Sequence, residues 1–112
     1  MKRFGLALDL KDDPELIQEY EAFHREVWPD VLDSLGESGI RRMDIYRAGT
    51  RLFMVIETSD DFSLERKQAL DQANPAVQRW ETLMDTYQQR LPGTPEDQKW
   101  TVMDRVFEYV SE

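Results

Sequence analysis

The sequence predicts one α+β domain, in which helices cover one face of an antiparallel sheet. The chain has 112 residues, a length typical of a single domain with a modest core. Two long segments carry apolar residues at helical spacing, whereas other segments alternate loosely or form short apolar runs, as strands do. No repeat or linker-like tract separates these segments. Residues 1–112 are therefore expected to fold as a single domain.

Residue patterns predict where the first strand and the first helix begin and end. Residues 3–10 alternate loosely between apolar and polar and predict a strand. Asp13 is a good N-cap, and the proline after it is a good first helical residue. Apolar residues then recur at helical spacing and predict one long helix that ends within residues 36–39. Because Pro29 removes a backbone donor inside this helix, we expect a kink near Trp28.

The second half of the chain is predicted to contain a hairpin, two helices and a last strand. Gly49 can supply the left-handed conformation that a tight turn needs. Asn74 and the proline after it repeat the cap-then-proline start of a helix. The expected elements are strands at 40–46 and 51–58 around a turn at 47–50, a helix at 60–72, a helix from 75, a polar loop at 91–97 and a strand at 100–110.

The order strand, helix, strand, strand, helix, strand is the ferredoxin-like βαββαβ pattern. All helices would then lie on one face of the antiparallel sheet. Residues 52–56 are apolar at every position, so the second sheet face needs cover as well. A second copy of the chain is the simplest cover, and we expect a homodimer that forms a dimeric α/β barrel.

Composition restricts the classes of partner. The net charge of −9, with no basic stripe to offset it, disfavours nucleic acid and anionic membranes. A small neutral ligand such as a sugar is not disfavoured. The chain has no cysteine, which excludes disulfides and thiol nucleophiles. The longest apolar run, 52–56, is too short to span a bilayer, and Asp9 interrupts the N-terminal apolar stretch, so we expect a cytoplasmic protein.

One stripe of the first predicted helix gathers Tyr20, His24 and Trp28, which are four residues apart. The histidine is the only one in the chain, and its unperturbed pKa of about 6.5 suits a general acid or base. A lone histidine can equally be structural or exposed. Metal binding is not expected, because there is no second histidine and the glutamates at 19, 21 and 26 do not have the spacing to chelate with it.

The other candidates carry weaker signals. Tyr20 could orient His24 or bind a ligand, or it could be a core tyrosine. The Trp80 indole suits a sugar ring, although its spacing favours packing of the helix onto the sheet. Trp28 is bulky and precedes the proline, which favours a core position, and both indoles are kept as candidate sugar contacts. The polar or soft side chains that could face a pocket are Met43, Asp44 and Glu57. Phosphate-loop, dinucleotide and hydrolase motifs are absent.

Over nearly its whole length, the chain resembles the L-rhamnose mutarotase family, in the branch that looks like L-fucose mutarotases. The most specific element is Tyr20-x-x-x-His24-x-x-x-Trp28-Pro29, and Gln78-Arg79-Trp80 supports it. The resemblance implies that His24 is the proton donor and that Tyr20 and Trp80 contact sugar. It also implies dimers of ferredoxin-like subunits.

Two positions depart from the rhamnose pattern. Met43 stands where rhamnose enzymes carry a sugar-binding tyrosine, and Glu81 stands where they carry a second tryptophan. Both departures fall at sugar contacts that the resemblance implies. They favour L-fucose over L-rhamnose as the substrate, with L-rhamnose as the alternative.

Mutarotation interconverts the α and β anomers of a sugar by opening and reclosing its ring, and it needs no cofactor or metal. One group protonates the ring oxygen while another accepts the proton of the anomeric hydroxyl. We expect His24 to be the acid. The base is left open among Tyr20, Asp44, Glu57, Glu81 and a bound water.

Two other functions remain open at this point. One is a small-ligand-binding module without catalysis, because fold alone does not establish an activity. The other is a monooxygenase on the same dimeric barrel, either cofactor-free or with His24 as an axial haem ligand.

Overall fold

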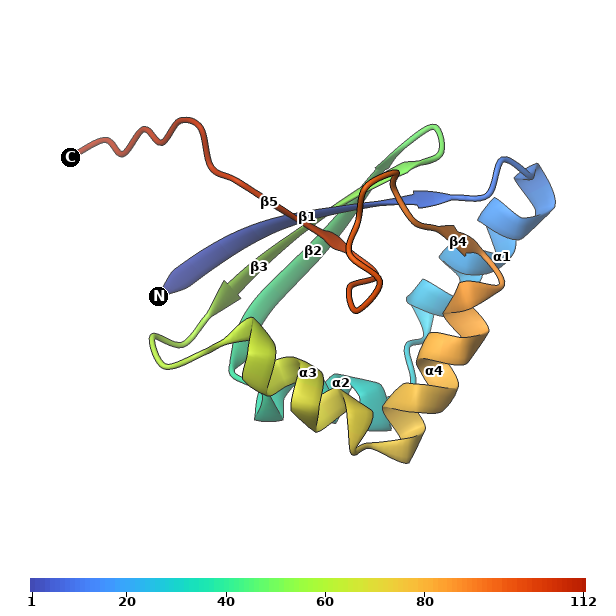
Figure 1. The fold of residues 1–112 in the computed structure, drawn as a ribbon, viewed down its shortest axis with the longest axis horizontal. Helices are drawn as coiled ribbons and strands as arrows, with labels where there is room; N and C mark the ends of the chain where they lie inside the picture. Colours follow the sequence, from blue (N-terminus) through green and yellow to red (C-terminus); the bar gives the residue numbers. More distant parts are fainter.

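An antiparallel sheet forms the framework of the molecule (Figure 1). The computed structural model describes residues 1–112, and its sheet has the order β2-β3-β1-β4, with β5 also paired to β1. The strands are β1 (Lys2–Leu10), β2 (Ile40–Ala48), β3 (Arg51–Thr58), β4 (Gln88–Gln89) and β5 (Thr101–Met103). The helices are α1 (Pro14–Arg25), α2 (Pro29–Glu37), α3 (Leu64–Gln72) and α4 (Pro75–Asp85). They lie together on one side of the sheet, which confirms the ferredoxin-like prediction.

The core fills the space between the sheet and the helices. Two clusters of buried apolar side chains occupy it, one around Trp80 and Leu52 and the other around Phe62 and Ile56. Leu52 and Ile56 are alternate residues of β3 and point to the helices, so Phe53 points to the opposite, open face. None of the helices is long and apolar enough to cross a membrane.

A β-bulge near the start of β2 decides which of its residues face the helices. Ile40 pairs with Thr58, but Arg42 pairs with Glu57, so one extra residue lies between them. A bulge of this kind reverses the alternation of the residues that follow. As a result Ile45, paired with Met54, faces the helices, and its neighbours along β2 face the open side.

The single long helix expected from residue 14 is wrong, because the structure has two helices instead of one kinked helix. Helix α1 ends at Arg25, and α2 begins at Pro29. Between them Glu26 has φ −140° and Trp28 has φ −57° and ψ 135°, which are not helical conformations. Proline sterically disfavours the α conformation in the residue before it, so Trp28 is extended and the helix stops.

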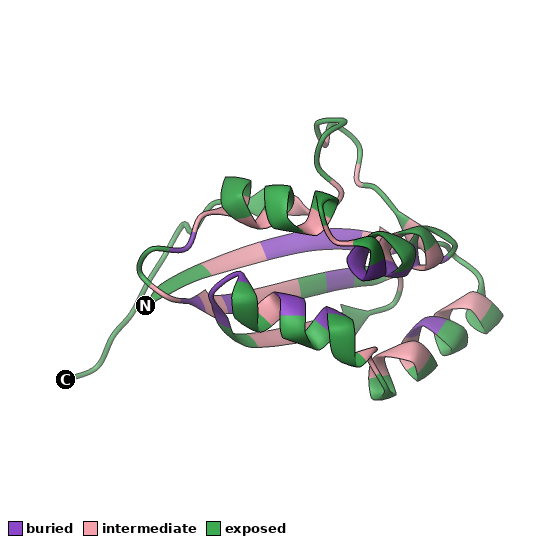
Figure 2. Ribbon diagram, turned by 90° about the horizontal axis from the view of Figure 1, so that it is seen from below, coloured by how far each residue is buried: buried purple, intermediate pink, exposed green.

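The last strand is much shorter than the predicted 100–110, and its end explains why. Met103 pairs with Gly5, so a continued ladder would place Arg105 opposite Arg3, which is unfavourable for like charges. The C-terminal segment therefore extends away from the sheet (Figure 2). Its apolar side chains Val106, Phe107, Tyr109 and Val110 are 76–95% exposed.

Two smaller differences concern the second half of the chain. Helix α3 begins at Leu64 instead of residue 60, because Ser63 caps it by accepting a hydrogen bond from the Arg66 backbone N–H. The two-residue strand β4 was not predicted from the sequence. The predicted turn at Gly49 is confirmed, with φ +60°.

Candidate functional site

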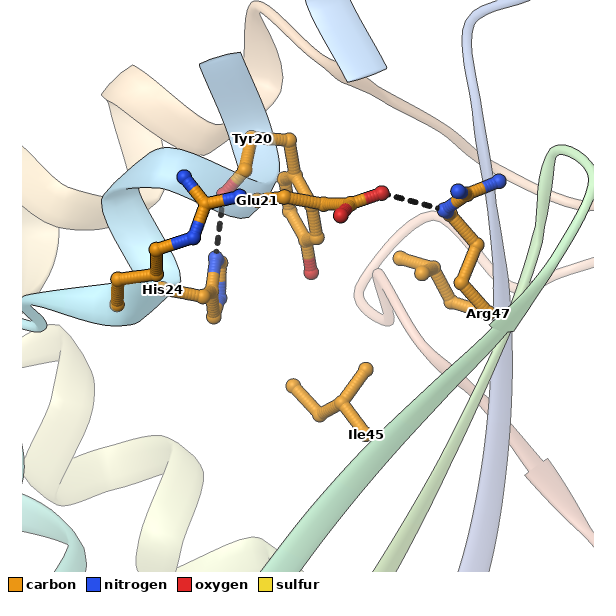
Figure 3. Close-up of a pocket in the computed structure, with 7 residues that line it drawn as sticks. Tyr20, Glu21, His24, Ile45 and Arg47 are labelled. Atoms are coloured by element: carbon orange, nitrogen blue, oxygen red, sulfur yellow. Dashed lines mark hydrogen bonds and ion pairs between the residues drawn. The ribbon is translucent and has the colours of Figure 1, made fainter. Parts of the chain in front are cut away.

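A cavity of about 420 Å³ opens between α1 and the β2–β3 hairpin (Figure 3). This volume is within the range of small-ligand pockets, about 300–1,000 Å³. Helix α1 provides one wall and the hairpin provides the other. The lining residues are Tyr20, Glu21, His24 and Arg25 from the helix, and Ile45, Arg47 and Leu52 from the strands.

His24 is held in one orientation by its own helix. Its Nδ1 lies 2.9 Å from the backbone carbonyl oxygen of Tyr20. A carbonyl oxygen can only accept, so Nδ1 carries the proton and Nε2 keeps its lone pair. Burial lowers the pKa of His24 because it disfavours the charged form, and the bond to the carbonyl opposes this effect. At neutral pH the imidazole is therefore uncharged, with Nε2 able to accept a proton.

Tyr20 presents a buried hydroxyl to the cavity. Its side chain is 3% exposed, and the hydroxyl makes no hydrogen bond of standard geometry within the chain, although the Gln88 side chain lies close enough to lower its pKa. Burial raises the pKa of Tyr20 to about 12, with an opposing effect of the Gln88 side chain and a further increase from the charge of Glu81. The phenol is therefore protonated at any physiological pH. An unpaired buried hydroxyl costs about 1–3 kcal/mol, so this site is suited to a ligand that supplies the missing partner.

The rings of Tyr20 and His24 stack one helical turn apart. Their centroids are 4.2 Å apart and the angle between the rings is 35°. Trp80 packs against His24 on the core side, with a distance of 5.5 Å between the two ring centroids. The ring centroid of Trp28 lies 5.1 Å from that of Trp80. Trp80 is buried and Trp28 half-buried, and neither lines the cavity. Trp80 therefore packs against the histidine from the core, and Trp28 packs against Trp80.

Three candidate residues on the strands, Met43, Asp44 and Glu57, do not line the cavity. Met43 faces the helices but packs against the core cluster around Phe62. Asp44 lies on the open face, where it accepts a hydrogen bond of 2.9 Å from Arg42. The expectation that Asp44 would face the pocket is therefore wrong, because the bulge in β2 turns it to the other side. Glu57 is likewise on the open face, 2.8 Å from Arg3.

Glu81 lies on α4 next to Trp80 and is engaged by a lysine. Its carboxylate is 2.6 Å from Nζ of Lys99, which is also 2.8 Å from the carboxylate of Asp85. Glu81 is not among the cavity residues. Its charge nevertheless contributes to the raised pKa of Tyr20.

The cavity contains a charged pair that was not predicted from the sequence. Arg47 Nε donates to Glu21 Oε1 at 2.7 Å and so connects the hairpin to α1. The only available signal was the position of Glu21, three residues before His24 on the same helix face. No cluster of three or more histidine, aspartate or glutamate side chains is arranged to hold a metal ion.

Comparisons with known proteins identify the family of this chain. The chain matches the family model of L-rhamnose mutarotase over residues 3–109. An L-fucose mutarotase from Xanthomonas campestris pv. campestris is 42% identical over 109 residues, which are 96% of this chain and 87% of that protein.

Two solved structures share the fold. A crystal structure of an L-rhamnose mutarotase from Formosa agariphila has a TM-score of 0.73 and 19% identity, covering 98% of this chain and all of that one. The tetracenomycin F2 cyclase of Streptomyces glaucescens has a TM-score of 0.76 and 20% identity over the full length of both chains. The match to the family model over almost the whole chain, together with the 42% identical relative, shows that this protein belongs to the L-rhamnose mutarotase family.

Proposed function

We propose that this protein is a sugar mutarotase, an isomerase that interconverts the α and β anomers of a 6-deoxy-L-hexose. L-Fucose is the preferred substrate and L-rhamnose the alternative. The observation that carries the proposal is the pairing of a neutral imidazole with an unpartnered, protonated phenol in one cavity. The name of the Xanthomonas campestris relative supports L-fucose. The cysteine-free composition is compatible with the cytoplasm, where we place this activity.

Ring opening needs an acid and a base side by side, because the ring oxygen O5 and the anomeric oxygen O1 are both bonded to C1. Two aromatic rings with centroids 4.2 Å apart meet that need. His24 Nε2 accepts the proton of the O1 hydroxyl, C1–O1 becomes a carbonyl and the C1–O5 bond breaks. O5 takes the proton of the Tyr20 hydroxyl. The C1 carbonyl then turns over and every step runs in reverse.

This assignment changes the direction of proton transfer expected from the sequence. The bond from Nδ1 to the Tyr20 carbonyl and the lowered pKa both favour His24 as the base of ring opening. On reclosure the resulting imidazolium returns its proton to O1, so His24 is the proton donor in that direction. General acid–base catalysis of this kind contributes about 10²- to 10⁴-fold, and no cofactor enters the scheme.

The direct test is saturation-transfer NMR on the anomeric protons of L-fucose and L-rhamnose, measured in parallel. The protein should accelerate exchange of L-fucose more than that of L-rhamnose. If neither sugar exchanges faster than in buffer, the enzymatic proposal fails and a non-catalytic binding module takes its place.

The pH dependence of the exchange rate should reveal the protonation state of His24. Its pKa is lowered from 6.5, and ring opening uses the neutral form. After subtraction of the buffer rate, the rate should be flat from neutral pH upward to mildly alkaline pH and should fall as the pH decreases through the pKa of His24. A rate that instead rises on acidification would show that the imidazolium is the acid, as the sequence alone suggested.

We further propose that two copies of the chain pair through the open sheet face. Tyr46 and Phe53 are cross-strand partners there and are 59% and 39% exposed. The Phe53 ring packs over Gly5, where an added Cβ would lie 3.1 Å from it. These rings on the sheet face, and the apolar C-terminal segment that extends away from the sheet, are apolar surfaces that a second copy would cover.

Phe53→Asp should convert the dimer to a monomer, because it places a charge at the centre of the apolar face. Light scattering after gel filtration measures the molar mass. Leu32→Asp is the matched control, since Leu32 is an exposed leucine on α2, away from the sheet face. A wild-type monomer, or a Phe53→Asp dimer, would contradict this interface.

A further inference from the structure

Besides the imidazole and the phenol, the cavity holds the ion pair between Glu21 and Arg47. The two residues come from different walls of the cavity, and their side chains meet with Nε of Arg47 2.7 Å from Oε1 of Glu21. Figure 3 shows the Glu21 carboxylate extending away from the His24 ring toward the guanidinium, with the Tyr20 ring between them. The pair therefore lies at the opposite end of the cavity from the imidazole.

The guanidinium is fixed from two sides. Besides the bond from Nε to Glu21, Nη1 donates to the backbone carbonyl oxygen of Gly49 at 2.7 Å, in the turn of the hairpin. Nη2 of Arg47 and Oε2 of Glu21 have no hydrogen-bond partner in the chain. The pair thus presents a free donor nitrogen on one residue and a free acceptor oxygen on the other, in an orientation set by the protein.

Stability does not account for this arrangement. The side chains of Arg47 and Glu21 are 38% and 41% exposed, and ion pairs this exposed contribute little to folding because water competes with both charges. A second observation in the same cavity points to a hydroxylated ligand. The Tyr20 hydroxyl is almost fully buried and lacks a partner.

We propose that Glu21 and Arg47 form the subsite that binds two neighbouring hydroxyls of the sugar ring, and so determine substrate preference. One hydroxyl donates to the carboxylate and the next accepts from the guanidinium. With C1 at His24 and Tyr20, the hydroxyls at the far side of the ring are those on C3 and C4. These two are cis in L-fucose and trans in L-rhamnose, so a rigid donor–acceptor pair distinguishes the two sugars. This inference depends on the proposed mutarotase activity.

Glu21→Gln and Arg47→Met test the subsite. We expect each variant to raise the KM for L-fucose about tenfold, the effect of losing one hydrogen bond to a charged group, with kcat changed less than about twofold. The preference for L-fucose over L-rhamnose should fall by a similar factor. D-Arabinopyranose has the same hydroxyl configuration as L-fucose at C2 to C4 but no methyl group, so its KM should rise in parallel. Glu19→Gln, on the same helix but outside the cavity, is the matched control and should change neither constant.

The outcomes separate this subsite from the proposed activity. If the wild-type protein accelerates exchange but both cavity variants keep its KM and its sugar preference, the subsite is wrong and the activity stands. A loss in kcat at unchanged KM would also overturn it, because the pair would then belong to the proton-transfer machinery. If the wild-type protein does not accelerate exchange of either sugar, the activity itself fails.

Discussion

Replacement of His24 by alanine is expected to lower the protein-catalysed exchange of L-fucose anomers by about 10²- to 10⁴-fold, the whole contribution of general acid–base catalysis. The imidazole is the only group in the cavity that is neutral at physiological pH and has a free nitrogen lone pair. Tyr20 cannot replace it, because a phenol with a pKa of about 12 is too weak an acid to provide a base at neutral pH. The Glu21 carboxylate is paired with Arg47 and extends away from the imidazole.

The same variant should fold. His24 is only half-buried, and its hydrogen bond is made to the helix backbone one turn away. Thermal unfolding monitored by circular dichroism should therefore give a transition as cooperative as that of the wild type. Added imidazole should restore part of the exchange rate of His24→Ala, because the truncated side chain leaves space for the free ring. A folded His24→Ala protein with full activity would show that the acid–base group is elsewhere.

The parts of the site that lie on one helix could be predicted from the sequence. Tyr20 and His24 are four residues apart, and Asp13 fixes where their helix starts by accepting hydrogen bonds from the backbone N–H groups of Glu15 and Leu16. Helical spacing alone then puts both rings on one face. The order of the main strands and helices along the chain was predictable for a similar reason, since the caps, prolines and turn glycine that delimit them are local features.

The strand residues of the site could not be predicted, because one extra residue changes the face of all that follow. Counting alternate residues from Ile40 puts Asp44 on the helix side. The bulge before Arg42 instead puts Ile45 and Arg47 there. No motif in residues 40–42 signals this bulge. The ion pair of Arg47 with Glu21 is also a tertiary contact between residues 26 positions apart, which local patterns do not show.

Tyr20→Phe should separate the stability of the fold from its activity. Replacing a buried tyrosine with phenylalanine normally destabilises a protein, because a hydrogen bond is lost. Here the hydroxyl makes no hydrogen bond of standard geometry, so only a weak interaction with the Gln88 side chain is lost. The free energy of unfolding, from urea titration, should be unchanged or raised by up to about 1 kcal/mol. The exchange rate should fall by about 10²-fold or more, since O5 loses its proton donor.

Tyr87→Phe is the matched control for this experiment. Tyr87 is buried in the same core cluster, with its ring centroid 6.3 Å from that of Tyr20, but it does not line the cavity. Removal of the Tyr87 hydroxyl should leave the exchange rate unchanged. Saturating L-fucose should raise the melting temperature of the wild type and of Tyr87→Phe more than that of Tyr20→Phe, because only the first two retain the hydroxyl that a sugar would satisfy. A Tyr20→Phe protein that is less stable yet fully active would identify this hydroxyl as a structural group and remove it from the mechanism.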